Sequence, residues 1–236
     1  MTGRCVPATN VLFLPGMMCD ERLFAPQLQA LGITAQVADF ARHESIADMA
    51  THALATAPPE FAVIGLSMGG IVAFEIWRQA PDRVTHLALL DTNAKPDTPE
   101  KRSTRLDQIS QAIHGGLREL AIESLKPVYL AECNRDDDQL LGTILDMALD
   151  LGPDVFRRQS LALRDRCDSV PTLATITCPT AVICGVEDRL CPVEYHELIA
   201  DEIDNATLTV LGDCGHLVTL EQPAAVTQEL QRLLAA

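Results

Sequence analysis

The sequence has few aromatic residues and few basic ones. Only 4% of its 236 residues are Phe, Trp or Tyr, and 18 Lys and Arg stand against 33 Asp and Glu, a formal net charge of −15. Proteins that bind nucleic acids or anionic membranes need a basic surface, and single-stranded nucleic acids are held by stacking on aromatic rings. The composition therefore argues against both nucleic acid and membrane as partners.

Long apolar runs are missing as well. No segment approaches the ~18 consecutive apolar residues of a membrane span, and residues 1–7 lack the apolar stretch of a secretory signal. We therefore expect a cytoplasmic protein. With 47% hydrophobic residues, the chain has enough apolar material for one large domain or two small ones.

The eight cysteines lack the spacing of a metal site. No C-x-x-C pair occurs, and Cys214 and His216 have no second pair at zinc-site spacing. Free thiols are expected rather than disulfides in a chain of this length without a secretory signal. We expect no metal ion, and a redox role for Cys19, Cys191 and Cys214, which fall in predicted loops, stays open.

Short apolar runs alternate with helical stretches in the first and last parts of the chain. Strands are expected at residues 10–14, 34–40, 61–65, 84–90, 180–184 and 206–211. Helices are expected at residues 21–31, 45–57, 69–79, 193–203 and 223–234. Apolar strands separated by helices predict a parallel sheet that is covered on both faces.

Residues 95–177 interrupt this alternation. They contain no strand-like run and consist of amphipathic helical stretches separated by Gly, Pro and Asp. The sequence therefore predicts one α/β core, formed by residues 1–94 and 178–236, with residues 95–177 inserted as a helical cap.

The segment Gly65-Leu-Ser-Met-Gly69 lies between a predicted strand and a predicted helix. A G-x-S-x-G sequence in this position is typical of a nucleophile elbow, in which a strained turn lifts the serine hydroxyl above the sheet. Residues two before and two after the serine must be small because they crowd the neighbouring strand and helix. Ser67 is therefore the candidate nucleophile, and a purely structural turn is the alternative.

A serine nucleophile needs an imidazole base that an acid orients. In the chain order Ser, acid, His, His216 follows the last predicted strand and is the candidate base. Asp188 follows the fifth strand and is the preferred acid, with Glu187 as the adjacent alternative. Asp91, which ends the fourth strand, is the other candidate, and we expect it to hydrogen-bond loop backbone beside the elbow.

A developing oxyanion needs two backbone N–H donors. One is expected from Met68, which follows the nucleophile, and the other from Met17 in the turn after the first strand. Met18 in the same turn is a candidate for the pocket wall, since methionine forms soft apolar surfaces. A plain core position is the alternative for Met18.

These segments resemble the α/β-hydrolase fold superfamily, and within it the esterase-type serine hydrolases with a helical cap. The matching segments are residues 12–17, 65–70, 185–188 and 215–223. The resemblance implies a three-layer fold with a cap between the fourth and fifth strands of this chain. It also implies hydrolysis of an ester or related acyl bond by Ser67, His216 and Asp188 through an acyl-enzyme, with no metal or organic cofactor.

Two features depart from the superfamily pattern. Pro15 stands where members often have His, so any role of that side chain is absent. Only about nine residues precede the first strand, too few for the usual N-terminal hairpin of two ~5-residue strands and a turn. We therefore expect a sheet of six strands that is wholly parallel.

The motifs leave the substrate open. A small, largely apolar acyl substrate is expected, but thioesterase, lactonase and carbon–carbon bond hydrolase chemistry use similar parts. A catalytically silent protein that binds a small ligand is a further alternative, and the oligomeric state is not indicated. The negative charge predicts a mild bias against anionic substrates, unless arginines of the insertion supply local positive charge: Arg102, Arg105, Arg157 or Arg158.

Overall fold

The computed structural model describes residues 10–33 and 35–236, and its sheet has six strands in the order β2-β1-β3-β4-β5-β6. Every neighbouring pair is parallel, as predicted. The strands are β1 Val11–Leu14, β2 Ala35–Val37, β3 Phe61–Leu66, β4 Val84–Leu90, β5 Thr180–Gly185 and β6 Ala206–Leu211. The hairpin that we expect to be missing would fall on residues 1–9, which lie outside the described residues.

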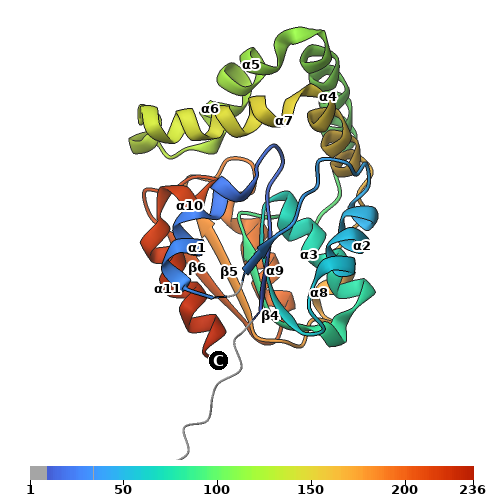
Figure 1. The fold of residues 1–236 in the computed structure, drawn as a ribbon, viewed down its shortest axis with the longest axis vertical. Coiled ribbons are helices and arrows are strands. Elements are labelled where there is room, and N and C mark those ends of the chain that lie inside the picture. Colours follow the sequence, from blue (N-terminus) through green and yellow to red (C-terminus); the bar gives the residue numbers. More distant parts are fainter. Residues whose placement is uncertain (1–9, 34) are drawn as a thin grey trace, which may run out of the picture.

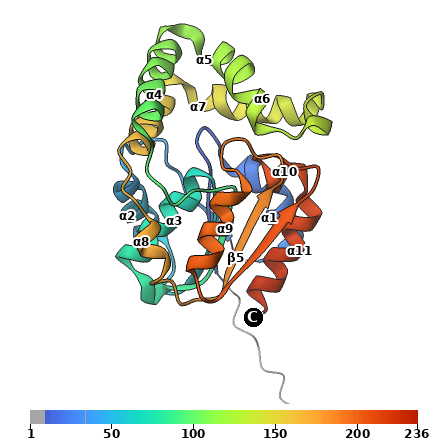
Figure 2. The same ribbon diagram turned by 180° about the vertical axis from the view of Figure 1, so that it is seen from behind.

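Helices cover both faces of the sheet and complete three layers (Figures 1 and 2). One face carries α2 Ile46–Thr56, α3 Met68–Gln79, α8 Val170–Leu173 and α9 Val193–Glu202. The other face carries α1 Ala25–Leu31 and α11 Pro223–Leu234, with the short α10 Val218–Glu221 beside them. The three-layer α/β prediction is therefore confirmed.

Alternation along the strands builds a separate hydrophobic core on each face. Leu12 and Leu14 of β1 belong to the core under α2, α3 and α9, whereas Val11 and Phe13 belong to the core under α1 and α11. Successive strand side chains point to opposite faces, so each inner strand needs apolar residues at every position. All six residues of β3 are buried for this reason.

Local sequence signals explain several element ends. The Ser45 hydroxyl oxygen accepts the backbone N–H of Asp48 at 3.0 Å and caps α2. The helix expected over residues 21–31 is instead a 3₁₀ turn, Glu21–Phe24, followed by α1. Pro26 explains the difference, because it has no N–H to donate to the carbonyl of Arg22 in a continuous α-helix.

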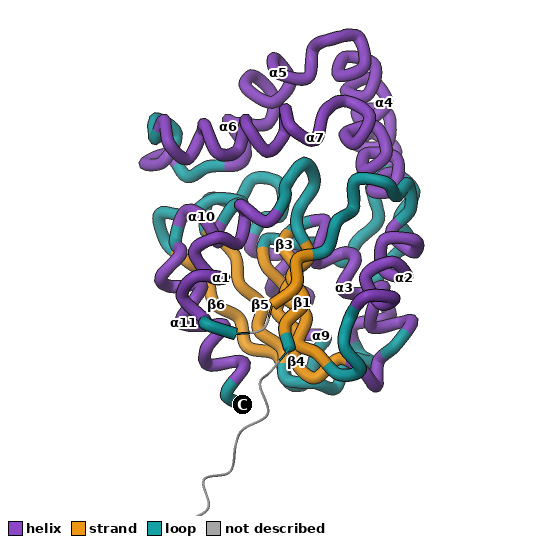
Figure 3. Tube along the Cα trace, viewed as in Figure 1, coloured by secondary structure: helices purple, strands orange, loops and turns teal. Residues whose placement is uncertain are grey.

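The described part of residues 95–177 contains helices and no strand, and most of it lies over the loops at one edge of the sheet (Figures 1 and 3). Its elements are α4 Pro99–Gln111, a π segment Ala112–Gly116, α5 Leu117–Glu119, a π segment Leu120–Leu125, α6 Lys126–Tyr129, a 3₁₀ turn Glu132–Asn134, α7 Asp138–Arg164 and α8. Helix α8 lies beside α3 rather than with α4 to α7. The division into a core, residues 1–94 and 178–236, and a cap, residues 95–177, stays a proposal. None of the helices described is both long and apolar enough to cross a membrane.

Candidate active site

Ser67 occupies a strained turn between β3 and α3. Its backbone has φ 54° and ψ −113°, outside the regions that most L-residues adopt. Strain of this kind persists only where the surrounding structure enforces it, and it is common at catalytic positions. The turn carries the serine at the edge of the sheet that faces the helices of the insertion.

Close backbone approaches at the elbow require glycine. A Cβ atom on Gly69 would overlap the carbonyl group of Leu14 in β1. A Cβ atom on Gly65 would overlap the backbone of Gly69 itself. Both approaches involve main-chain atoms that cannot move aside easily, so the glycines two before and two after Ser67 are dictated by packing.

Three predicted side chains meet in one hydrogen-bonded chain. The Nε2 atom of His216 lies 2.9 Å from the Oγ atom of Ser67, and its Nδ1 atom lies 2.7 Å from Oδ2 of Asp188. Because a carboxylate oxygen can only accept, Nδ1–H donates to Asp188 and Nε2 is left to accept from the serine hydroxyl. His216 is 3% exposed and Asp188 is 4% exposed.

Asp188 is held rigidly for its contact with the imidazole. Its second oxygen, Oδ1, accepts the backbone N–H groups of Leu190 at 2.8 Å and Cys191 at 2.9 Å. Burial lowers the pKa of His216, but the Asp188 carboxylate, as a charge and as a hydrogen-bond acceptor, raises it above the ordinary value of 6.5 overall. The pair therefore favours a His216 that readily takes up a proton.

The two alternative acids do not contact the imidazole. Asp91 is fully buried, and its oxygens accept the backbone N–H groups of Gly185 at 3.1 Å and Val218 at 3.0 Å. This matches the expected backbone role, and it ties the last residue of β5 to the first residue of α10. Burial, together with the charge of Asp188, raises the pKa of Asp91. Glu187 instead accepts the backbone N–H of Glu132 at 2.9 Å.

The turn after β1 contains Met17, whose backbone N–H is one of the two expected oxyanion donors. The N–H of Cys19 donates to the Gly16 carbonyl at 3.2 Å, and the N–H of Met18 donates to Oε1 of Gln159 at 2.8 Å. Among the described residues no acceptor takes the N–H of Met17 or that of Met68. Gln159, on α7, was not anticipated, since nothing in its sequence context links it to a turn 141 residues earlier.

The loop of His216 is clamped by two further residues that the sequence did not reveal. One Glu221 carboxylate oxygen accepts the N–H groups of Gly215 and Leu217, and the other accepts the N–H of Ala131. The ring of Tyr129 stacks on the His216 ring with centroids 5.7 Å apart. Together these contacts join the histidine loop to the insertion.

His196 supports the elbow from behind. Its Nε2 atom accepts the backbone N–H of Thr92 at 2.8 Å, and the Thr92 hydroxyl donates to the Ser67 carbonyl at 2.7 Å. Burial lowers the pKa of His196 to about 4, which keeps the ring neutral and able to accept. Both of its ring nitrogens thus lie within hydrogen-bond distance of backbone atoms, of Thr92 and of Pro192.

Cys19 and Cys191 line the cavity at the site, and Cys214 lies two residues before His216. Burial raises the pKa of Cys19 to about 12 and raises the pKa values of Cys191 and Cys214 as well, so few of these thiols ionise. Ligand atoms of Asp188, Cys191 and His216 lie within 4.8 Å of one another, close enough to hold a metal ion. The Asp188 and His216 atoms already bond each other, however, so a metal would have to displace that pair.

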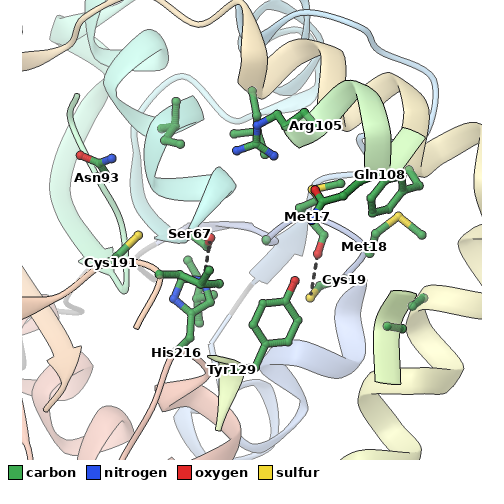
Figure 4. A pocket seen from close by; sticks show the side chains of 18 of the residues that line it. Met17, Met18, Cys19, Ser67, Asn93, Arg105, Gln108, Tyr129, Cys191 and His216 are labelled. Carbon is green, nitrogen blue, oxygen red and sulfur yellow. Dashed lines mark hydrogen bonds between the residues drawn. The ribbon is translucent and has the colours of Figure 1, made fainter. Parts of the chain in front are cut away.

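A cavity of about 270 Å³ opens onto Ser67 and His216 (Figure 4). One wall is apolar and includes Met17, Met18, Leu117, Ala148 and Phe156. Another part of the lining is polar and carries charged side chains of the insertion, Asp97, Lys101, Arg105 and Arg166. Met18 lines this cavity and is also packed into a hydrophobic cluster.

Known proteins resemble this chain over most of its length. A pimeloyl-acyl-carrier-protein methyl ester esterase of Pectobacterium atrosepticum is 29% identical over 78% of this chain and 73% of its own. A thermophilic esterase from Thermogutta terrifontis, crystallised with malate, is similar in structure with a TM-score of 0.87 and 29% identity, over 96% of this chain and 89% of that chain.

A third similarity concerns the fold alone. The enol-lactonase of Burkholderia xenovorans superposes with a TM-score of 0.86 at 22% identity, covering 99% of this chain and 94% of that chain. The model of the alpha/beta hydrolase family matches residues 11–229, nearly the whole described chain. With its parallel sheet, its serine elbow and this match, the chain belongs to the alpha/beta hydrolase family and is a hydrolase of that type.

Proposed function

We propose that this protein hydrolyses an ester bond of a small, largely apolar substrate through an acyl-enzyme. The observation that carries the proposal is the chain Ser67–His216–Asp188, with contacts of 2.9 and 2.7 Å, at the edge of a cavity of about 270 Å³. Ester hydrolysis is also the activity named for the Pectobacterium relative and for the Thermogutta structure.

The first half of the reaction forms the acyl-enzyme. Ser67 Oγ attacks the carbonyl carbon while His216 Nε2 takes the hydroxyl proton, and Asp188 stabilises the resulting imidazolium. The oxyanion accepts the backbone N–H groups of Met17 and Met68, which have no other acceptor among the described residues. The intermediate then collapses, and His216 passes its proton to the departing alcohol.

The second half releases the acid. Water enters the vacated position, His216 takes one of its protons, and the hydroxide attacks the ester carbon of the acyl-enzyme. The same two N–H groups hold the second oxyanion. Collapse breaks the bond to Ser67 Oγ, which regains its proton from His216, and the carboxylic acid leaves.

The apolar wall supports an acyl chain as the bound part of the substrate. Met17 and Met18 lie beside the elbow, and Leu117 and Phe156 face them from the insertion. An aliphatic chain that leaves water for this wall gains about 0.8 kcal/mol for each buried methylene. A panel of p-nitrophenyl esters and matched thioesters of increasing chain length measures this preference and separates esterase from thioesterase chemistry.

The decisive variant is Ser67→Ala. It should lower kcat for a short p-nitrophenyl ester by ~10⁴-fold or more, because the covalent intermediate can no longer form. Ser103→Ala, an exposed serine on α4, is the matched control and should retain the wild-type rate.

Labelling with a fluorophosphonate tests the catalytically silent alternative. A functional nucleophile should react in the wild type and in Ser103→Ala, but not in Ser67→Ala. A wild-type protein that neither labels nor cleaves any ester of the panel would refute the proposed function and favour the silent binding protein.

A further inference from the structure

The polar edge of the cavity contains more positive than negative charge. Arg105 and Arg166 both pair with Asp97, at 2.5 Å and 2.6 Å. Lys101 lines the same edge and has no carboxylate within 4.0 Å among the described residues. Three cations and one anion therefore line this edge of the cavity, and only two of the cations pair with the anion. The rest of the chain is acidic, with a net charge of −15, so this local excess is unusual for the molecule.

The guanidinium of Arg105 has two nitrogen atoms, Nη1 and Nη2, that remain available as hydrogen-bond donors. Its Nε atom donates to Asp97, and in the described part of the chain no acceptor is bound to Nη1 or Nη2. Figure 4 shows the guanidinium facing the same open space as the hydroxyl groups of Ser67 and Tyr129. Two parallel N–H groups in one plane match the two oxygens of a carboxylate.

Arg166 is a buried cation close to a second cation, Arg105, an arrangement that costs free energy. Its side chain is only 5% exposed, and it donates to the carbonyls of Lys95 at 3.0 Å and Leu163 at 2.8 Å. Burial lowers the pKa of Arg166, and the charge of Arg105 lowers it further against the opposing effect of Asp97. Repulsion between buried like charges is relieved when an anion enters, so this edge of the cavity is suited to an anionic ligand.

We propose that Arg105, with Arg166 and Lys101, forms a subsite for a carboxylate on the acyl chain of the substrate. Half-esters of dicarboxylic acids are then the preferred substrate class: the methylene chain packs on the wall of Met17, Met18 and Phe156 while its terminal carboxylate reaches Arg105. The inference rests on the proposed ester hydrolysis at Ser67. It reverses the bias against anionic substrates that the net charge alone predicts.

The test compares two esters that differ only in this charge. Mono-p-nitrophenyl esters of dicarboxylic acids of four to eight carbons are assayed against counterparts whose free carboxylate is capped as a methyl ester. The wild type should favour the anionic ester at the best length, and Arg105→Gln should lower this anionic-to-capped ratio of kcat/KM by about 10- to 100-fold, the span of one charge-assisted hydrogen bond. The free dicarboxylate should inhibit cleavage of the capped ester, and more weakly in Arg105→Gln.

Two further variants keep the test decisive. Arg102→Gln, on the same helix, removes an exposed arginine that pairs with Asp165 outside the cavity, and it should leave the ratio at its wild-type value. Lys101→Gln changes an exposed side chain that the fold does not need, and it should lower the ratio by a smaller factor even if Arg105→Gln fails to fold.

The outcomes separate this inference from the proposed function. Cleavage of the capped esters that depends on Ser67, with no preference for the anionic partner or no effect of Arg105→Gln and Lys101→Gln on the ratio, overturns the subsite alone. Absence of cleavage of every ester overturns the proposed function, and the inference fails with it.

Discussion

Charged groups on the core side of the cavity and on the side of the insertion differ in how fully they are hydrogen-bonded. On the core side, one oxygen of Asp188 accepts two backbone N–H groups, and each oxygen of Asp91 accepts one. His216 is hydrogen-bonded at both ring nitrogens. On the side of the insertion, Arg105 and Arg166 share Asp97 and keep donor capacity for a further group. The charged groups on the core side are fully paired within the protein, whereas those on the other side leave donors for the substrate carboxylate that we propose.

Under the proposed function, this difference separates the groups that react with the substrate from the groups that select it. Reactive groups must keep a fixed geometry to within about 0.5 Å, which loops at the end of a buried sheet provide because their backbones are tied to one another. Groups that recognise a substrate need free donors, and the helices of the insertion carry them. Each prediction below removes a contact on one side, or compares matched positions on the two sides.

The largest effect is expected from Asp188→Asn. An amide in place of the carboxylate can no longer accept from Nδ1–H with the same strength and favours the wrong imidazole tautomer, so kcat should fall by ~10⁴-fold. Turnover of a short p-nitrophenyl ester measures this, with thermal unfolding as the check that the fold is retained.

Asp91→Asn is the matched change at the neighbouring strand. One of the two N–H groups that Asp91 accepts would face an amide N–H instead, at a cost of ~1–3 kcal/mol in the free energy of unfolding. Its kcat should fall far less than that of Asp188→Asn. An equal loss of kcat in the two folded variants would contradict the assignment of Asp188 as the orienting acid.

Replacing a glycine by alanine should have opposite effects on the free energy of unfolding on the two sides of the cavity. Gly69→Ala places a Cβ atom on the Leu14 carbonyl and should lower the free energy of unfolding by ~3 kcal/mol or more. Gly142→Ala, on α7 with no atom within 4 Å of the new Cβ, should raise it by ~0.5–1 kcal/mol. Urea unfolding measures both changes. A Gly69→Ala protein as stable as the wild type would show that the elbow is not tightly packed.

The pH dependence of activity reports on His216. The imidazole must be neutral to accept the Ser67 proton, and its pKa lies above 6.5 in the folded protein. We therefore expect kcat/KM to fall tenfold per pH unit below an inflection above 6.5. In Asp188→Asn, where the main raising influence is gone, the inflection should move to lower pH.

The contribution of His216 to the free energy of unfolding should fall as the pH rises, whereas activity should rise. Because folding raises the pKa of His216 above its unfolded value, the protonated imidazole contributes stability that is fully present below pH 6.5 and is lost as the pH rises through the folded pKa. Unfolding measured across the same pH range checks this sign. An activity inflection at or below 6.5 would contradict the pairing of His216 with Asp188.

The sequence predicted the reactive side well for a physical reason. In a parallel sheet, the loops that follow the strands all meet at one edge, so Ser67, Asp188 and His216 could be expected together although 149 residues separate the first from the last. The glycines beside Ser67 strengthened the prediction, because a close backbone approach restricts residue choice more than any surface position does.

The side of the insertion was much less predictable. Arg105 was one of four arginines considered, and Arg166 was not among them, because charged residues on amphipathic helices are usually solvated. Gln159, Tyr129 and the clamp of Glu221 were missed. Gln159, Tyr129 and the Glu221 contact to Ala131 act across a long stretch of chain, and none of the three residues has a motif of its own.

The sequence by itself determined the parallel sheet, the serine elbow and the chain order of Ser67, Asp188 and His216. Periodic apolar strands and obligatory glycines are local requirements, and a chain displays them directly. Only the tertiary structure decided that Asp188 rather than Asp91 meets His216, and that Arg105 and Arg166 pair with Asp97 in a cavity that Lys101 also lines. Those pairings depend on how helices and loops pack against one another, and no single segment encodes them.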